Sequence, residues 1–150
     1  MTPRSLYRLV AIAEAITWTL LIAGLALRAT TGWALGVTIG GGIHGFVFLV
    51  YAATALLVGI DRRWRPRTVV LAVAAAVVPY ATIVAHRLLE TRGLLAGDWR
   101  RDRDATGDRT PLDALVRWFV RRPVLLIVVA VVVLVAIFTV LLLVGPPGGR

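Results

Sequence analysis

The fold is decided in residues 40–51, which read GGGIHGFVFLVY. Here an imidazole, a cluster of glycines and a row of aromatic side chains meet inside one long apolar stretch, Gly36–Ile60. That stretch exceeds the ~20 residues that a helix needs to cross a hydrocarbon core of about 30 Å. Working outward from it, comparable stretches occur at Leu6–Leu27, Val69–Leu89 and Val124–Val144. We therefore predict an all-α, polytopic membrane protein with four membrane-spanning helices.

Composition and charge restrict the partners of the chain. Apolar residues make up 59% of the 150 residues, whereas soluble domains average about 45–50%. The absence of cysteine excludes disulfides and thiolate metal sites. The formal net charge is +9, and all 17 positive side chains are arginines gathered near the ends of the apolar stretches. That placement favours membrane topology and anionic headgroups over DNA or RNA, so we expect a lipid bilayer and no nucleic acid as a partner.

The chain divides into four parts. Residues 5–90 are expected to form a three-span core, and residues 91–109, which alternate both charges, a mobile connection. Residues 110–123 predict a short amphipathic helix at the membrane interface, because Thr110, Pro111 and Asp113 form a helix start. Residues 124–144 predict a C-terminal transmembrane anchor. The expected lipid contacts of the interfacial helix are Arg117, Trp118, Arg121 and Arg122.

Small residues predict where the spans pack together. In the first span, Ala11 and Ala15 belong to a ridge that repeats at every fourth residue, and in the second Gly41 and Gly45 form a G-x-x-x-G pattern. Small side chains let helices approach closely in lipid, where burial of apolar surface gives no driving force. The alternative for the glycines is a locally unwound helix that opens toward a ligand.

The acid in the first span is the main candidate for a polar site. A charged carboxylate in lipid costs at least ~2.5–3.5 kcal/mol, so we expect Glu14 to face the helix bundle. Counting from span midpoints places His44 at another depth, too far from Glu14 for a direct bond. Pro79 frees a backbone carbonyl that a neighbour must satisfy. The candidate polar site therefore comprises Glu14, Trp18, His44, Tyr51, Pro79 and Tyr80.

Several chemical readings of these residues stay open. Glu14 is either a protonated acid hydrogen-bonded between helices or a coupling site for a proton or cation, as in the small multidrug resistance transporters, which the local Ala13-Glu14 pattern resembles. His44 and His86 are expected at one depth, where two imidazoles could ligate a haem iron or a metal. Motifs of soluble enzymes are missing from the sequence. The sequence predicts no catalytic residues, no cofactor and no metal.

Arginine positions give conflicting evidence on orientation. The compact cluster in Arg62–Arg67 favours the cytoplasmic side for that loop, and hence both termini inside a bacterial inner membrane. Arg121 and Arg122, directly before the last span, favour the reverse.

Three motifs resemble one family. They are RLVAIAEAITW at residues 8–18, IHGFVFLVY at residues 43–51 and VPYAT at residues 78–82. Together they are similar to the YdzA-like bacterial integral membrane proteins (domain of unknown function 3817), over about residues 5–90. The resemblance implies a small membrane protein without an assigned activity. We expect a non-enzymatic structural or accessory protein that associates with itself or with another membrane protein, and the alternative is a proton-coupled transporter.

Overall fold

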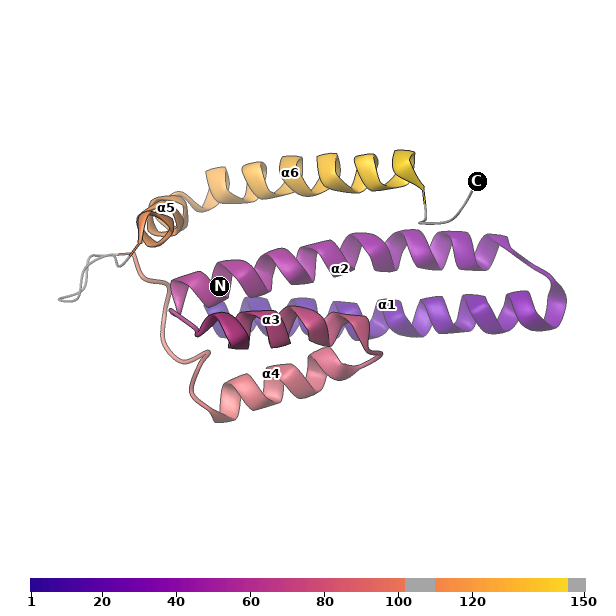
Figure 1. The fold of residues 1–150 in the computed structure, drawn as a ribbon, viewed down its shortest axis with the longest axis horizontal. Helices are drawn as coiled ribbons and strands as arrows, with labels where there is room; N and C mark the ends of the chain where they lie inside the picture. The colour runs from indigo at the N-terminus through magenta and orange to yellow at the C-terminus, as the bar shows by residue number, and fades with distance from the viewer. Residues whose placement is uncertain (102–109, 146–150) are drawn as a thin grey trace.

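The computed structural model describes residues 1–101 and 110–145, and this part of the chain is helical, without strands (Figure 1). The prediction of an all-α protein is confirmed for these residues. The elements follow one another along the chain as α1 (Pro3–Thr31), α2 (Leu35–Asp61), α3 (Pro66–Ala74), the 3₁₀ helix η1 (Ala75–Val77), α4 (Ala81–Thr91), α5 (Pro111–Val120) and α6 (Pro123–Val144).

Three of the described helices are long and apolar enough to cross a membrane: α1, α2 and α6. Helices α1 and α2 form an antiparallel pair joined by a tight turn at Gly32, where φ of +75° suits a residue without a Cβ. Helix α6 runs along the outer side of α2 (Figure 1), and none of its residues is buried. The length and the composition of these three helices are thus those of a membrane protein.

The third apolar stretch does not form the single spanning helix that we predicted for Val69–Leu89. Helix α3 and η1 run back along α2, the chain reverses at Pro79 and Tyr80, and α4 returns along α1 (Figure 1). The tip lies beside the middle of α1, where the Tyr80 hydroxyl is 3.3 Å from Thr19 Oγ1. Proline cannot donate the next helical hydrogen bond, and Tyr80 has a left-handed φ of +64°. The stretch is therefore a hairpin of two short helices, which runs about halfway along the bundle and then returns.

This hairpin changes the topology. Helix α1 begins at one end of the bundle and α6 finishes at the other (Figure 1). If α1, α2 and α6 each span the bilayer once, the two ends of the chain lie on opposite sides. The four-span layout with both termini on one side does not fit this arrangement, because two half-length helices replace the expected third span.

The first part of the charged connection, residues 91–109, which we expect to be mobile, makes contacts with the bundle. Leu95 is 1% exposed, and Trp99 Nε1 donates to the Met1 carbonyl at 2.8 Å. The backbone N–H of Arg100 donates to Asp61 Oδ1 at 3.1 Å. Two apolar side chains and one buried carboxylate therefore fasten residues 94–100, while residues 102–109 lie outside the described part.

Helix α5 begins as its sequence predicts. The Thr110 side chain accepts from the Asp113 N–H at 3.2 Å, and Asp113 Oδ2 accepts from the Thr110 N–H at 3.1 Å. Asp113 is buried, whereas Leu112, Leu115 and Trp118 are exposed. The face with Leu112, Leu115 and Trp118 thus points away from the bundle, while Val120 at the end of the helix is buried.

Candidate functional site

A stripe of buried residues on α1 builds the polar site. It contains Tyr7, Val10, Ala11, Glu14 and Thr17, whose spacing of three and four residues places them on one helix face. This face packs against α2 and α4 and does not lie on the outside of the bundle. The stripe carries an acid, a phenol and a hydroxyl, so the buried interface between these helices contains polar groups.

Glu14, Thr17 and His44 meet in the centre of this interface. Glu14 is 0% exposed, and its Oε2 lies 3.8 Å from Nδ1 of His44 on α2. Thr17 Oγ1 donates to the Glu14 carbonyl at 3.0 Å and lies 3.2 Å from His44 Nδ1. The same hydroxyl lies 3.5 Å from Glu14 Oε2. A threonine thus stands between an acid and an imidazole, while Glu14 Oε1 has no hydrogen-bond partner in the described part of the chain.

The expectation that His44 lies at another depth than Glu14 is wrong. We had aligned the spans by their midpoints, but the short turn at Gly32 sets the register instead. The contact of Thr17 with His44 and the close approach of Gly24 to Gly36 show this register, because both pairs are centred on residues 30–31, in the last turn of α1 just before the connection. Helix α2 continues past the start of α1, so its midpoint lies nearer to that end.

Trp18 and Tyr51 donate to backbone carbonyls of the hairpin. Trp18 Nε1 donates to the carbonyl of Ala76 at 3.1 Å, where α3 tightens into the 3₁₀ helix η1. The Tyr51 hydroxyl donates to the Ala72 carbonyl at 3.0 Å and therefore accepts from the Tyr7 hydroxyl, 2.6 Å away. The Ala76 carbonyl at the break is thus satisfied from a neighbouring helix, whereas the carbonyl four residues before Pro79, that of Ala75, accepts from the Val78 N–H at 3.4 Å. Trp18 also reaches the acid–imidazole group, since its ring centroid lies 4.4 Å from that of His44.

The hairpin tip stays outside the polar cluster. Tyr80 is 46% exposed and contacts Thr19 of α1 instead of Glu14. Pro79 is exposed and marks the reversal of the chain. Thr82, on the first turn of α4, is buried and donates to the Ala11 carbonyl at 3.1 Å. Of the six predicted site residues, Glu14, Trp18 and His44 therefore come together, Tyr51 lies farther along the interface, and Pro79 and Tyr80 form the turn.

Other small residues make the closest helix contact. A Cβ on Gly24 would meet the Gly36 carbonyl oxygen at 2.7 Å, and one on Gly40 would meet the Leu20 carbonyl oxygen at 3.1 Å. A Cβ on Gly41 would make only an ordinary contact with a leucine, at 3.8 Å, and one on Gly45 would meet Phe138 of α6 at 3.7 Å.

Of the two alanines predicted to pack between helices, only one lies fully in a helix contact. Ala11 is buried under α4, whereas Ala15 is half-buried. The contact face of α1 therefore follows the polar stripe instead of the ridge of small residues.

The two histidines lie apart. His44 contacts Thr17, while His86 stacks on Tyr7 with ring centroids 6.2 Å apart. Ten residues of α1 separate these contacts, or about 15 Å along the helix. The two imidazoles cannot share one ligand in this arrangement. Within the described residues there is also no group of three or more acidic or histidine side chains arranged around a metal position.

Sequence reasoning missed Tyr7 and did not predict the observed contacts of Thr17 and Thr82. The signal for Tyr7 was its distance of seven residues from Glu14, which puts the two on one helix face. Thr82 could be found only after the turn at Tyr80 was known, because that turn directs α4 back onto α1. The cluster as built can hold and exchange a proton between a carboxyl, a hydroxyl and an imidazole.

Comparison with known proteins gives a family and a relative. The family model described as "Domain of unknown function (DUF3817)" matches residues 4–91, which cover α1 to α4. A Streptomyces coelicolor protein named "Putative membrane protein SCO5905" is 39% identical over 110 residues. The match covers 71% of this chain and 12% of that protein, so the chain spans only a small part of its relative's length. No solved structure matches.

Proposed function

The chain belongs to the DUF3817 family, and from this premise we propose that it is a small, non-enzymatic membrane protein that acts through helix–helix association. It works as a structural or accessory protein of the bacterial inner membrane. The observation that carries the proposal is α6, a 22-residue apolar helix in which no residue is buried. Its ring contact with the bundle is Phe138 against Phe46, at 5.5 Å between centroids. Such a helix leaves most of its surface for lipid or for another protein.

The closed polar core supports this proposal. Glu14, Tyr7, Tyr51 and Thr82 are each 0% exposed, so the acid lies inside a packed interface. Hydrogen bonds between helices stabilise bundles in lipid by roughly 0.6–2 kcal/mol each. The core therefore provides a rigid body on which α6 and the hairpin are presented.

Photo-crosslinking tests the association. A benzophenone amino acid is introduced in membranes at Val128, Val131, Val132 and Val135, all of which are exposed on α6. We expect adducts with protein, a second copy or another membrane protein, at positions that recur every third or fourth residue. The same label at Ile16 of α1 is the control. If none of the labelled positions on α6 forms an adduct with protein, the proposal is contradicted and α6 is a lipid-facing anchor.

We also propose that the N-terminus is cytoplasmic and that α6 ends outside. Every described arginine except Arg28 lies near the end of the bundle where α1 begins. Arginine excess near span ends marks the cytoplasmic side. The half-length hairpin supports this, because it brings the loop at Arg62–Arg67 and the segment at Arg121 and Arg122 to one side. The two groups of arginines, which favour opposite orientations in a four-span layout, therefore favour the same orientation here.

Cysteine labelling tests this orientation, since the chain has no cysteine of its own. A membrane-impermeant maleimide is expected to label Thr31→Cys in intact cells and Arg63→Cys only after the cells are opened. The opposite pattern would reverse the assignment.

One observation favours the alternative, a proton-coupled transporter. Glu14 Oε1 is buried without a partner, next to Thr17 and His44, which can exchange a proton with the carboxyl. In a transporter, Glu14→Gln abolishes pH-dependent uptake or resistance while folding survives. In a structural core, Glu14→Gln changes only stability or assembly, which the unfolding of the purified protein in detergent would measure.

A further inference from the structure

A cavity of about 340 Å³ opens between α1 and α4 near the end of the bundle where α1 begins. Its polar lining consists of Arg8 from α1 and of His86, Arg87 and Glu90 from α4. Its apolar lining consists of Ala11, Ile12 and Ile83. A cationic rim therefore adjoins an apolar floor. This arrangement is complementary to an anionic phospholipid, whose phosphate lies next to its apolar acyl chains.

The positive charge at this cavity exceeds the negative charge. Glu90 forms an ion pair with Arg4. Arg8 and Arg87 are exposed and have no acidic partner among the described residues. Three arginines and one carboxylate leave two positive charges uncompensated. The cavity therefore favours an anion.

His86 forms the inner wall of the cavity. It is 8% exposed, and its Nδ1 lies 3.9 Å from Glu90 Oε2. Its Nε2 is enclosed by the protein, so the contacts to a ligand come from the two arginines of the rim.

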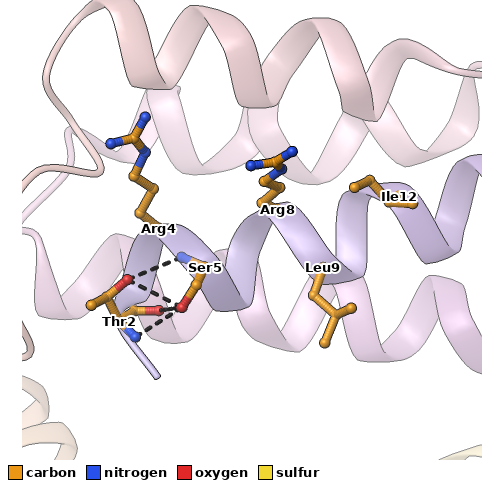
Figure 2. A pocket seen from close by; sticks show the side chains of 6 residues that line it. All are labelled: Thr2, Arg4, Ser5, Arg8, Leu9 and Ile12. Atoms are coloured by element: carbon orange, nitrogen blue, oxygen red, sulfur yellow. Dashed lines mark hydrogen bonds between the residues drawn. The ribbon is translucent and has the colours of Figure 1, made fainter.

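The neighbouring hollow in Figure 2 extends the site along α1. It shares Arg8 and Ile12 with the cavity and adds Arg4 and Leu9. Thr2 and Ser5 bond to each other there, as the dashed lines show, so they are engaged in capping the helix. The hollow thus contributes arginines and an apolar wall that continues toward the membrane centre.

The depth of the site suits a lipid. Arg8 and Arg28 lie twenty residues apart on α1, or about 30 Å, the thickness of a hydrocarbon core. Arg8 therefore lies at one interface. We propose that the cavity between α1 and α4 binds the phosphate headgroup of an anionic phospholipid, held by Arg8 and Arg87. One acyl chain lies along Leu9 and Ile12. This proposal does not depend on the role of Glu14 or α6.

Binding of an acyl-labelled fluorescent phosphatidylglycerol to the full chain in neutral detergent micelles tests the site by anisotropy. We expect Arg8→Gln/Arg87→Gln to weaken binding by about tenfold or more, because each arginine near an anionic headgroup contributes several-fold. Arg65→Gln/Arg67→Gln removes the same charge at the same end of the bundle, outside the cavity, and is expected to weaken binding less than about twofold. Labelled phosphatidylcholine is expected to bind much more weakly.

Three results would overturn the proposal. They are equal weakening by the control pair, equal binding of phosphatidylcholine, and displacement of the lipid by millimolar inorganic phosphate at matched ionic strength. The last result would assign the site to free phosphate. If the double variant does not fold, as judged by circular dichroism, Arg8→Gln and Arg87→Gln are measured singly, with at least a threefold loss expected for each and no loss contradicting the site.

Discussion

Gly24→Ala tests how closely α1 approaches α2. A Cβ on Gly24 would lie 2.7 Å from the Gly36 carbonyl oxygen and 2.8 Å from its carbonyl carbon. Both atoms belong to backbone, which cannot turn aside as a side chain can. An ordinary contact begins at 3.4 Å, so the helices must separate by roughly 0.7 Å at this point. Overpacking of this kind costs about 1–3 kcal/mol.

Gly42→Ala is the matched control, because a Cβ on Gly42 would meet nothing within 4 Å. Both substitutions gain the same helix propensity of about 1 kcal/mol, so the difference between the two variants isolates the clash. We expect Gly24→Ala to be about 1–3 kcal/mol less stable than Gly42→Ala. The assay is unfolding by sodium dodecyl sulfate in mixed micelles, followed by circular dichroism. Equal stability of the two variants would refute the close approach of Gly24 to Gly36.

Three further predictions concern the hydrogen bonds that hold the hairpin. Trp18→Phe removes the donor to the Ala76 carbonyl, so we expect a loss of about 1–3 kcal/mol in unfolding stability and faster amide hydrogen exchange at residues 76–82. Tyr51→Phe leaves the Tyr7 hydroxyl without its acceptor, so it should destabilise more than Tyr7→Phe in the same unfolding assay; the reverse order would contradict the direction of this bond. Thr82→Val keeps the shape but loses the bond to α1, and we expect a cost of about 1 kcal/mol, seen as a lower midpoint of detergent-induced unfolding.

The sequence predicted the helices better than their arrangement. Apolar length identified α1, α2 and α6, and the Thr110–Asp113 pattern identified the start of α5. Length alone cannot distinguish one spanning helix from two half-length helices, because Val69–Leu89 has enough apolar residues for either. Pro79 was the visible signal of a break. The left-handed Tyr80, which turns that break into a reversal, leaves no pattern in the sequence.

The residues of the candidate site could be predicted better than the contacts between them. Glu14, Trp18 and His44 were identified because polar groups in apolar stretches must be satisfied. Their mutual distances depend on helix register, which the three-residue connection at Gly32 fixes and hydropathy does not encode. The closest helix contact uses Gly24, Gly36 and Gly40 instead of the G-x-x-x-G pair, since register also decides which small residues face each other.

The polar residues of the core divide into two groups by what the fold requires of them. A hairpin whose tip lies beside the middle of a candidate spanning helix leaves carbonyls without helical donors where α3 passes into the 3₁₀ helix η1, and lipid cannot satisfy them. Trp18 and Tyr51 meet that need at Ala76 and Ala72. Glu14 and His44 form no hydrogen bond to the hairpin among those described, and Glu14 Oε1 has no partner at all in the described chain. Since the reversal of the chain is stabilised without them, the acid–imidazole pair is the part of the core whose cost the hairpin does not explain, and substitutions there separate a structural core from a proton-binding one.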